Sequence, residues 1–304
     1  MKDFIEISDF SAEQLSLLMG RAIADKRLYR GGQLGPVLDR KCLAMVFEKP
    51  SLRTRVSFEA AMTHLGGHAL HLTQADIGLG TREAVQDVAR VLGRMCDGIM
   101  ARTFSHDMVR RLAAHSAVPV INALTDFSHP CQAMADLMTA REHFGDLAGR
   151  TLAFIGDGNN VARSLAAACA KFDMAFVLAS PEAFQLDEAF VGSLPAGSFR
   201  WTPRPAEAVA DADVVYTDTW VSMGQEDEKQ RRLKAFEGFQ ISAELMSAAP
   251  DRAIVMHCLP AYRGYEITDE VFEAHAGTIM EEAENRLHFQ RTLLAVLIGE
   301  GGVE

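Results

Sequence analysis

The sequence has no long apolar run and no excess of positive charge. No segment approaches the roughly 18 apolar residues that span a bilayer, and the opening stretch MKDFIEISDF has neither the basic nor the apolar part of a signal peptide. The formal net charge is -11 over 304 residues, which argues against nucleic acid as the main partner. We therefore expect no membrane partner and no nucleic-acid partner.

Paired cysteine motifs are also absent. The five cysteines are scattered, without a CxxC pair: Cys42, Cys96, Cys131, Cys169 and Cys258. Such spacing favours a reduced, cytoplasmic protein over a disulfide framework. His257 and Cys258 are adjacent, but two neighbours do not supply a tetrahedral zinc site, and no second pair has ligand spacing. We expect no metal and no cofactor.

What the sequence does contain is an alternation of short apolar runs with helix-like stretches. Hydrophobic residues make up 48% and charged residues 23%, as in a globular protein with a sizeable core. The strand-like runs cover residues 42–48, 68–73, 98–102, 118–123, 151–157, 174–180, 212–218 and 253–260. Strands separated by helices predict right-handed βαβ units and parallel sheets.

The length suggests about two domains. The Gly-rich stretch GDLAGR (145–150) is the candidate boundary, which gives domains 1–147 and 148–304. We expect an α/β fold of two parallel-sheet domains with the active site in the cleft between them. The final helix, about 281–299, is expected to pack back on the first domain. Ligands of such sheets bind beyond the carboxyl ends of the strands, and the candidate motifs fall there.

The stretch PSLRTR (50–55) follows the first strand. A helix starting there would direct backbone N–H groups and its positive end at one point, where the Ser51 and Thr54 hydroxyls and the Arg53 guanidinium could bind phosphate oxygens. The plainer interpretation, a capped helix with two surface arginines, is equally compatible with these residues. A P-loop is excluded because its GxxxxGK pattern is missing.

The stretch FIGDGNN (154–160) resembles a dinucleotide fingerprint. Val161 stands where the third glycine would be, and the next strand ends VLAS without an acid. This argues against an NAD-dependent dehydrogenase. Asn159 and Asn160 at a helix start could bind a carboxylate or an amine, although Asp, Gly and Asn also favour ordinary turns.

Further candidates each have a structural alternative. His129 and Gln132, at a helix start, could hold a carbonyl group, or His129 could be a cap or a core histidine. Asp218 at a strand end could fix a cationic amine or cap a helix. Cys258 would need a low thiolate pKa to act as a nucleophile. Arg286 among acids on a helix resembles a surface ion pair.

Taken together, these motifs change the interpretation. The chain resembles the ornithine carbamoyltransferase family from about residue 3 to 299, because its motifs occur in the order and spacing of that family. These motifs are FEKPSLRTRVSFE, ART (101–103), DFSHPCQAMAD, FIGDGNN, DTWVSMG, HCLPA and EAENR. The SxRTR and HPxQ patterns are shared with the wider superfamily, which includes the aspartate enzyme. DTWVSMG and HCLPA point to ornithine.

The resemblance implies transfer of the carbamoyl group of carbamoyl phosphate to the δ-amine of L-ornithine. It also implies roles for particular residues. Phosphate would be held by Ser51, Leu52 (through its backbone), Arg53 and Thr54, and the carbamoyl group by Arg102, His129, Gln132 and Arg286. Ornithine would be bound by Asn160, Asp218, Ser222 and Met223, with Cys258 and the Leu259 carbonyl beside the reacting amine. Arg55 would be structural.

Two positions depart from the family pattern, and several rivals stay open. Leu52 replaces a frequent threonine, and Gly78 replaces a Gln or His that reaches into the neighbouring subunit's site; Thr81 or Arg82 could replace that contact. Such enzymes are typically homotrimers or multiples of trimers. The rivals are carbamoyltransferases for N-acetylornithine, putrescine or aspartate, and a non-catalytic anion-binding subunit. Whether the enzyme serves arginine synthesis or degradation does not follow from motifs.

Overall fold

The computed structural model describes residues 2–221, 224 and 226–300. The chain forms two compact units, one of Met1–Met138 with Glu284–Glu304 and the other of Thr139–Ala283. The division therefore falls inside helix α6 (Pro130–Phe144), before the Gly-rich break at 145–150. Candidate residues Ser222 and Met223 lie outside the described residues.

The first unit is built on a four-stranded parallel sheet with strand order β2-β1-β3-β4. Its strands are β1 (Cys42–Phe47), β2 (His68–Thr73), β3 (Gly98–Arg102) and β4 (Val120–Leu124). Its helices before the division are η1 (Ile7–Asp9), α1 (Ala12–Arg30), α2 (Leu52–His64), α3 (Gln74–Ile77), α4 (Val85–Met95) and α5 (His106–His115). The four strands confirm the predicted runs to within two residues at either end.

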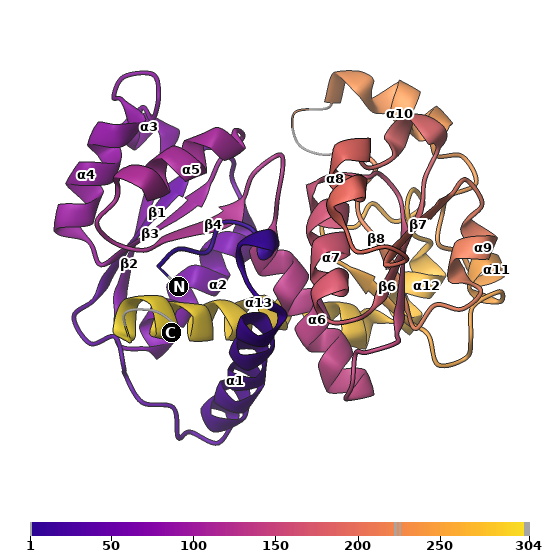
Figure 1. Ribbon diagram of the computed structural model, residues 1–304, viewed down its shortest axis with the longest axis horizontal. Coiled ribbons are helices and arrows are strands. Elements are labelled where there is room, and N and C mark those ends of the chain that lie inside the picture. Colours follow the sequence, from indigo (N-terminus) through magenta and orange to yellow (C-terminus); the bar gives the residue numbers. More distant parts are fainter. Residues whose placement is uncertain (1, 222–223, 225, 301–304) are drawn as a thin grey trace. The chain divides into compact units, whose positions relative to one another are not determined.

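Apolar side chains explain how helices cover this sheet. Ala44 and Val46 of β1 alternate in direction with their neighbours and pack in one cluster with Val88 of α4 and Leu112 of α5. Figure 1 shows α4 and α5 on one side of the sheet and α1, α2 and α13 (Ala276–Leu294) on the other. Because the strands are parallel, their carboxyl ends and the starts of the helices that follow them lie at the same edge of the sheet. The candidate residues lie at this edge.

The start of α1 shows that local sequence signals are reliable here. Ser11 Oγ accepts from the backbone N–H of Gln14 at 3.1 Å, and the Gln14 Oε1 atom accepts from Ser11 N at 3.1 Å. This reciprocal capping box satisfies two N–H groups that would otherwise lack a helical partner. Ser11 is thus the N-cap of α1.

The second unit contains a five-stranded parallel sheet with strand order β7-β6-β5-β8-β9. The strands are β5 (Thr151–Ile155), β6 (Ala175–Ala179), β7 (Phe199–Thr202), β8 (Val214–Thr217) and β9 (Ile254–His257). The helices are α7 (Asn160–Lys171), η2 (Glu182–Phe184), α8 (Glu188–Ser193), α9 (Pro205–Val209), η3 (Glu226–Glu228), α10 (Lys229–Ala235), α11 (Ala243–Met246) and α12 (Asp269–Ala274).

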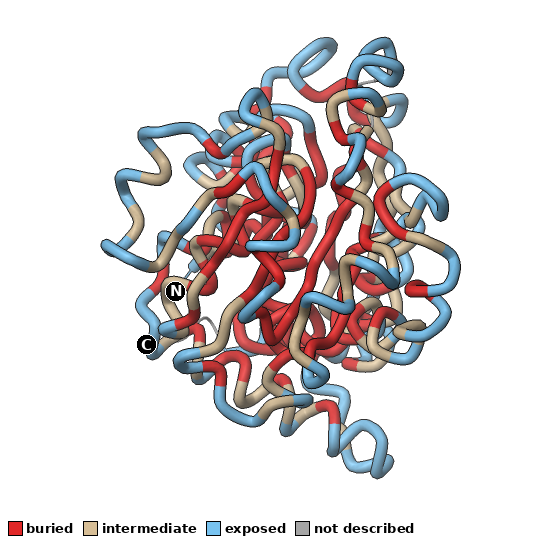
Figure 2. Tube along the Cα trace, turned by 90° about the vertical axis from the view of Figure 1, so that its right-hand side faces the viewer, coloured by how far each residue is buried: buried red, intermediate tan, exposed pale blue. Residues whose placement is uncertain are grey.

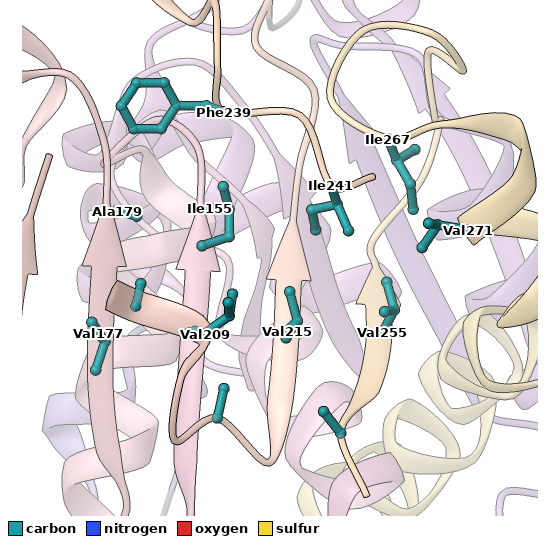
Figure 3. Close-up of a cluster of buried hydrophobic side chains, with 14 of the residues drawn as sticks. Ile155, Val177, Ala179, Val209, Val215, Phe239, Ile241, Val255, Ile267 and Val271 are labelled. Atoms are coloured by element: carbon teal, nitrogen blue, oxygen red, sulfur yellow. The ribbon is translucent and has the colours of Figure 1, made fainter. Parts of the chain in front are cut away.

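Its core is a layer of branched side chains on one face of the sheet. Val177, Val215 and Val255 come from three strands and pack with Val209 and Val271 of the covering helices, as Figure 3 shows. Figure 2 shows buried residues gathered along the inner stretches of the trace, whereas many of the outer turns are exposed. β-branched residues are the ones that fit such a pleated surface best.

Two sequence predictions need correction. The edge strand β7 was not predicted, because FRWT is only four residues long and part-exposed. The last helix was predicted from about residue 281 but begins at Ala276, and its last predicted turn is a π-helical turn, η4 (Ala295–Gly299). None of the helices in the described part is both long enough and apolar enough to cross a membrane.

Candidate active site

The candidate residues fall into two groups, one in each unit. We name the first the anion half-site (Ser51, Leu52, Arg53, Thr54, Arg102, His129, Gln132 and Arg286) and the second the amine half-site (Asn160, Asp218, Cys258 and Leu259).

The anion half-site begins at the start of α2. Ser51 is the N-cap, and its Oγ accepts from Thr54 N at 3.2 Å and donates to Thr54 Oγ1 at 3.1 Å. The capped-helix interpretation is therefore correct for Ser51, and it does not exclude anion binding, because capping positions the helix N-terminus. Leu52 is 76% exposed, so its side chain is not part of the core.

The other members come from the ends of neighbouring elements. Arg102 ends β3 and lies opposite Phe47 of β1 in the sheet register, so it is close to the loop leading into α2. His129 immediately precedes α6, and Gln132 lies in the first turn of that helix. Arg286 on α13 donates from Nη1 to Gln132 Oε1 at 2.6 Å and from Nη2 to Thr54 Oγ1 at 3.3 Å.

His129 is the best electrostatic probe of this half-site. Burial holds the pKa of its imidazole well below the usual 6.5, and the positive charges of Arg286, Arg102 and Arg53 lower it further. Three guanidinium groups therefore act on one neutral imidazole. The arrangement suits a multiply charged anion, with His129 neutral and able to donate one hydrogen bond near pH 7.

A network that the sequence did not predict shapes the loop before His129. Thr125 Oγ1 accepts from Ser128 N at 3.1 Å and lies 2.9 Å from His106 Nδ1. His106 Nε2 lies 2.8 Å from Glu6 Oε1, which also accepts from Arg110. The loop that carries His129 is thereby tied to residue 6, at the other end of the unit's sequence.

This network makes a pH-dependent contribution to stability. The hydrogen bond from His106, and after it that from Arg110, lowers the pKa of Glu6 from 4.5 to about 2. A carboxyl group with a depressed pKa in the folded state stabilises the protein fully above its unfolded pKa and loses that effect as pH falls through the folded value. The stabilisation should therefore be present at pH 7 and decline between about pH 4.5 and 2.

We expect Glu6→Gln to lower the free energy of unfolding at pH 7 by about 1–2 kcal/mol, a figure that allows for solvent screening. Urea unfolding at pH 7 and pH 3.5 measures it, and the difference from wild type should be smaller at pH 3.5. Glu237→Gln, at an exposed residue, is the matched control. An equal difference at both pH values would contradict the assignment.

The sequence suggested no role for Lys49, which is buried in the structure. Its ammonium group pairs with Asp126 and lies 4.1 Å from the centroid of the Phe104 ring. A pocket of about 490 Å³ is lined by Ser51, Leu52, Arg55 and His71 among others. The pocket shares Ser51 and Leu52 with the anion half-site, but Arg53, Arg102 and His129 do not line it.

The Gly78 position has a structural reason for its residue type. Gly78 has a φ of 65°, and a Cβ atom there would lie 2.6 Å from Arg82 Cβ. The Arg82 guanidinium turns back to donate to the Asp76 carbonyl at 2.7 Å, and Thr81 Oγ1 donates to the Gly78 carbonyl at 3.0 Å. A larger side chain at 78 would need a different loop conformation.

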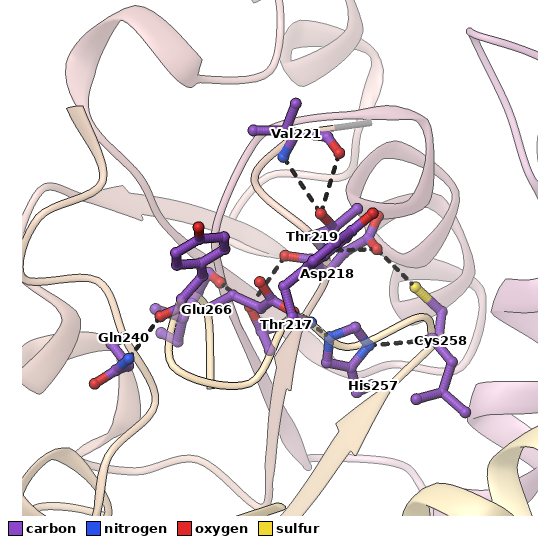
Figure 4. A network of polar contacts seen from close by, with 12 residues as sticks. Thr217, Asp218, Thr219, Val221, Gln240, His257, Cys258 and Glu266 are labelled. Atoms are coloured by element: carbon purple, nitrogen blue, oxygen red, sulfur yellow. Dashed lines mark hydrogen bonds and ion pairs between the residues drawn. The ribbon is translucent and has the colours of Figure 1, made fainter. Parts of the chain in front are cut away.

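The amine half-site centres on Asp218, at the end of β8 (Figure 4). Its Oδ1 accepts from Thr219 N at 2.8 Å and from Cys258 Sγ at 3.1 Å, and its Oδ2 accepts from Asn159 Nδ2 at 2.9 Å. Cys258 follows β9, which is the neighbour of β8 in the sheet. Asp218 is therefore not a helix cap, and the strand order brings its carboxylate to the thiol.

Asn159, rather than Asn160, makes the contact with Asp218. Asn159 caps α7, with its Oδ1 accepting from Val161 N at 2.9 Å and Ala162 N at 3.1 Å, so its Nδ2 is directed at the carboxylate. Asn160 is the first residue of α7, and its carbonyl accepts from Ser164 Oγ at 2.9 Å. The sequence located the turn but did not distinguish the two asparagines.

The backbone that carries Cys258 and Leu259 is held by a buried pair. Leu259 has a φ of 60°, and its N–H donates to His257 Nδ1 at 2.9 Å. His257 Nε2 must then carry the proton, which it donates to Glu266 Oε1 at 3.1 Å. Both side chains are fully buried. Glu266 was not predicted, because no local pattern relates it to His257.

The same contacts bear on metal binding. Ligand atoms of Asp218, His257 and Cys258 lie within 4.8 Å of one another. Both ring nitrogens of His257 are engaged, however, one by a backbone N–H and the other by Glu266. The histidine cannot act as a ligand without losing one of these bonds, so the donor set does not fit a metal ion.

Comparison with known proteins gives consistent results. Residues 2–142 match the family model "Aspartate/ornithine carbamoyltransferase, carbamoyl-P binding domain", and residues 148–297 match "Aspartate/ornithine carbamoyltransferase, Asp/Orn binding domain". The ornithine carbamoyltransferase of Methanospirillum hungatei is 50% identical over 299 residues, 98% of this chain and 99% of that protein. The solved ornithine carbamoyltransferase of Pyrococcus furiosus superposes with a TM-score of 0.94 at 45% identity, covering 100% of this chain and 98% of the other.

Proposed function

The chain belongs to the aspartate/ornithine carbamoyltransferase family, and on that premise we propose that it is an ornithine carbamoyltransferase. It transfers the carbamoyl group of carbamoyl phosphate to the δ-amine of L-ornithine, which gives L-citrulline and phosphate. The observation that carries the choice of ornithine is the Asp218 carboxylate, held beside Cys258 at the ends of two neighbouring strands. A carboxylate attracts a cationic amine and repels the second carboxylate of aspartate.

Carbamoyl phosphate belongs to the anion half-site. The N-terminus of α2, with Ser51, the Leu52 backbone, Arg53 and Thr54, holds the phosphate. Arg102, His129, Gln132 and Arg286 hold the carbamoyl group. The effect of all three arginines on the pKa of His129 supports this assignment, because each guanidinium group must be within electrostatic range of the same imidazole. As phosphate leaves, preorganised donors stabilise the growing negative charge.

Ornithine belongs to the amine half-site. Asp218 orients the δ-amine, and Cys258 and the Leu259 carbonyl lie beside it. The contact between Asp218 and Asn159 supports including the start of α7, where Asn160 is the proposed ligand. Ser222 and Met223, which lie outside the described residues, complete the proposed set. The proposed catalytic residues are Asp218 and Cys258 of the amine half-site and Arg102 and His129 of the anion half-site.

The transfer forms a bond between the δ-nitrogen and the carbamoyl carbon and breaks the bond from that carbon to the phosphate oxygen. The attacking amine must be neutral. An alkyl amine with a pKa of about 10.4 costs roughly 4.6 kcal/mol to deprotonate at pH 7. Asp218 stabilises the cation and so improves binding while opposing deprotonation. The departing phosphate, rather than a side chain, then takes the proton.

We expect kcat/KM for ornithine to climb from pH 6 to above pH 8, by about tenfold per unit at first, because the neutral amine increases in that proportion. His129 cannot produce this limb, since its pKa lies well below 6.5 and the imidazole is already neutral there. Initial rates at saturating carbamoyl phosphate measure the profile. A flat profile from pH 6 to 8 would contradict amine deprotonation as the controlling step.

The assembly and compartment are also proposals. We propose a homotrimer or a multiple of trimers, and exposed apolar side chains on the first unit, Leu52, Val56 and Met95, support an interface there. We propose a cytoplasmic location, because all five cysteines are free thiols.

The proposed function is tested by citrulline formation from carbamoyl phosphate and ornithine, run beside aspartate, putrescine and N-acetylornithine. Turnover with ornithine alone would support the proposal. Turnover with another amine would be compatible with carbamoyl phosphate binding in the anion half-site, but it would overturn the assignment of ornithine to the amine half-site. Binding of carbamoyl phosphate without turnover of any amine would favour a non-catalytic anion-binding protein.

A further inference from the structure

The Arg286 guanidinium is held between two uncharged amides. On one edge, Nη1 donates to Gln132 Oε1 at 2.6 Å. On the other, the Gln290 amide is assigned from its hydrogen-bond partners with its oxygen towards the guanidinium, and this oxygen then accepts from Nε at 3.1 Å and from Nη2 at 3.0 Å. The Gln290 nitrogen in turn donates to the Arg286 carbonyl at 3.2 Å and to the Ser57 hydroxyl of α2. Arg286, Gln132 and Gln290 are all buried.

The Gln132 amide is held in one orientation by a buried carboxylate. Gln132 Nε2 donates to Asp136 Oδ1 at 2.7 Å, and Asp136 is 1% exposed. An ionised carboxylate only accepts hydrogen bonds, so it can face the NH₂ end of the amide but not its oxygen. The Gln132 oxygen is therefore directed at Arg286, and the contacts form a chain from Asp136 through Gln132 and Arg286 to Gln290.

Helix geometry places both outer members of this chain. Asp136 follows Gln132 by four residues on α6, and Gln290 follows Arg286 by four residues on α13 (Figure 1). Residues four apart lie one above the other on the same helix face. Each outer residue can thus hold its partner's side chain from one turn away without entering the space that the partner faces.

We propose that Asp136 and Gln290 are positioning residues for carbamoyl phosphate. Asp136 fixes the Gln132 amide with its oxygen towards Arg286, and Gln290 fixes the plane of the Arg286 guanidinium. This inference rests on the proposed function, which assigns Gln132 and Arg286 to the carbamoyl group. Neither outer residue touches the substrate itself.

The uncharged nature of Gln290 is part of this role. A glutamate at 290 could accept from the same two guanidinium nitrogens, but it would place a negative charge against Arg286. That charge would weaken the attraction for an anionic substrate. Gln290→Glu therefore separates the effect of charge from that of shape, and Gln290→Leu removes the hydrogen bonds altogether.

The experiment compares Gln290→Leu, Gln290→Glu, Asp136→Leu and Asp136→Asn in the intact enzyme, with KM measured for each substrate at saturation of the other. We expect the two leucine variants to raise KM for carbamoyl phosphate by about 10- to 100-fold, while KM for ornithine changes by less than about threefold. Gln290→Glu should also raise KM for carbamoyl phosphate. Asp136→Asn, which keeps an oxygen acceptor, should lie between wild type and Asp136→Leu.

Gln86→Leu is the matched control, because Gln86 Oε1 accepts from Arg111 Nη2 at 3.1 Å in the same kind of pair on the exposed surface of the same unit. Its kinetics should match wild type. Unchanged KM for carbamoyl phosphate in the leucine variants, or equal losses for both substrates, would overturn the inference. If a leucine variant does not fold, as judged by circular dichroism, Gln290→Glu and Asp136→Asn decide by the same criterion.

A calorimetric titration with phosphonoacetamide, a stable mimic of carbamoyl phosphate, separates this inference from the proposed function. Wild-type binding with 10- to 100-fold weaker binding by Gln290→Leu supports the positioning role whichever amine is the acceptor. Equal binding by both overturns it. Wild-type binding without citrulline formation would instead refute only the proposed function.

Discussion

Arg53→Ala is expected to lower kcat/KM for carbamoyl phosphate by about 100- to 1,000-fold, while the protein stays folded. Arg53 lies in the first turn of α2, where the helix N-terminus already favours an anion. Its charge, with those of Arg286 and Arg102, lowers the pKa of His129, so the three guanidinium groups are within electrostatic range of one imidazole. The Arg53→Ala change removes a hydrogen-bond donor that is in place before the phosphate departs.

Arg55→Ala is the matched control for this variant. Arg55 Nε donates to Glu59 Oε1 at 2.9 Å, four residues along the same helix, and its side chain is 50% exposed. Such an exposed pair contributes about 0.3–0.5 kcal/mol to stability, so we expect nearly wild-type kinetics from Arg55→Ala. Steady-state rates with varied carbamoyl phosphate measure both variants. Equal kinetics for the two would return PSLRTR to the role of a capped helix with surface arginines.

The parts of the fold that were predicted from sequence are those with local causes. The run CLAMVF became β1 because six consecutive apolar or small residues suit a strand buried on both faces. The helix start near His129, where α6 begins at Pro130, was likewise predicted from neighbouring residues. Strand β7 lacks such a signal, because its position depends on pairing with β6 rather than on its own composition.

The candidate site divides in the same way. Residues at strand ends and helix starts, such as Arg102 and His129, could be located because parallel strands end on one edge of their sheet. The residues that hold them could not. Glu6 contacts His106 from 100 positions away, and Gln290 resembles any polar helix residue until α13 is packed against α2. Supporting contacts of this kind depend on tertiary structure and leave no pattern in the chain.

Asp218→Asn is expected to raise KM for ornithine by about 100- to 1,000-fold and to leave KM for carbamoyl phosphate nearly unchanged. A carboxylate about 4 Å from an ammonium group in a partly buried site contributes on the order of 4 kcal/mol of attraction. The asparagine would lose this charge. It would also turn an NH₂ group towards donors, since the two carboxylate oxygens accept from Asn159 on one side and from Thr219 and Cys258 on the other.

The pH dependence gives this variant a second readout. Asp218 stabilises the cationic amine in the bound state, so its removal should lower the pKa of bound ornithine and move the rising limb of kcat to lower pH. Asp211→Asn is the matched control, because Asp211 is exposed just before the other end of β8. Rates over pH 6–9 with varied ornithine measure both effects. If KM for ornithine and the pH range over which kcat rises were both unchanged, the carboxylate would serve only to hold Asn159 and Cys258 in position.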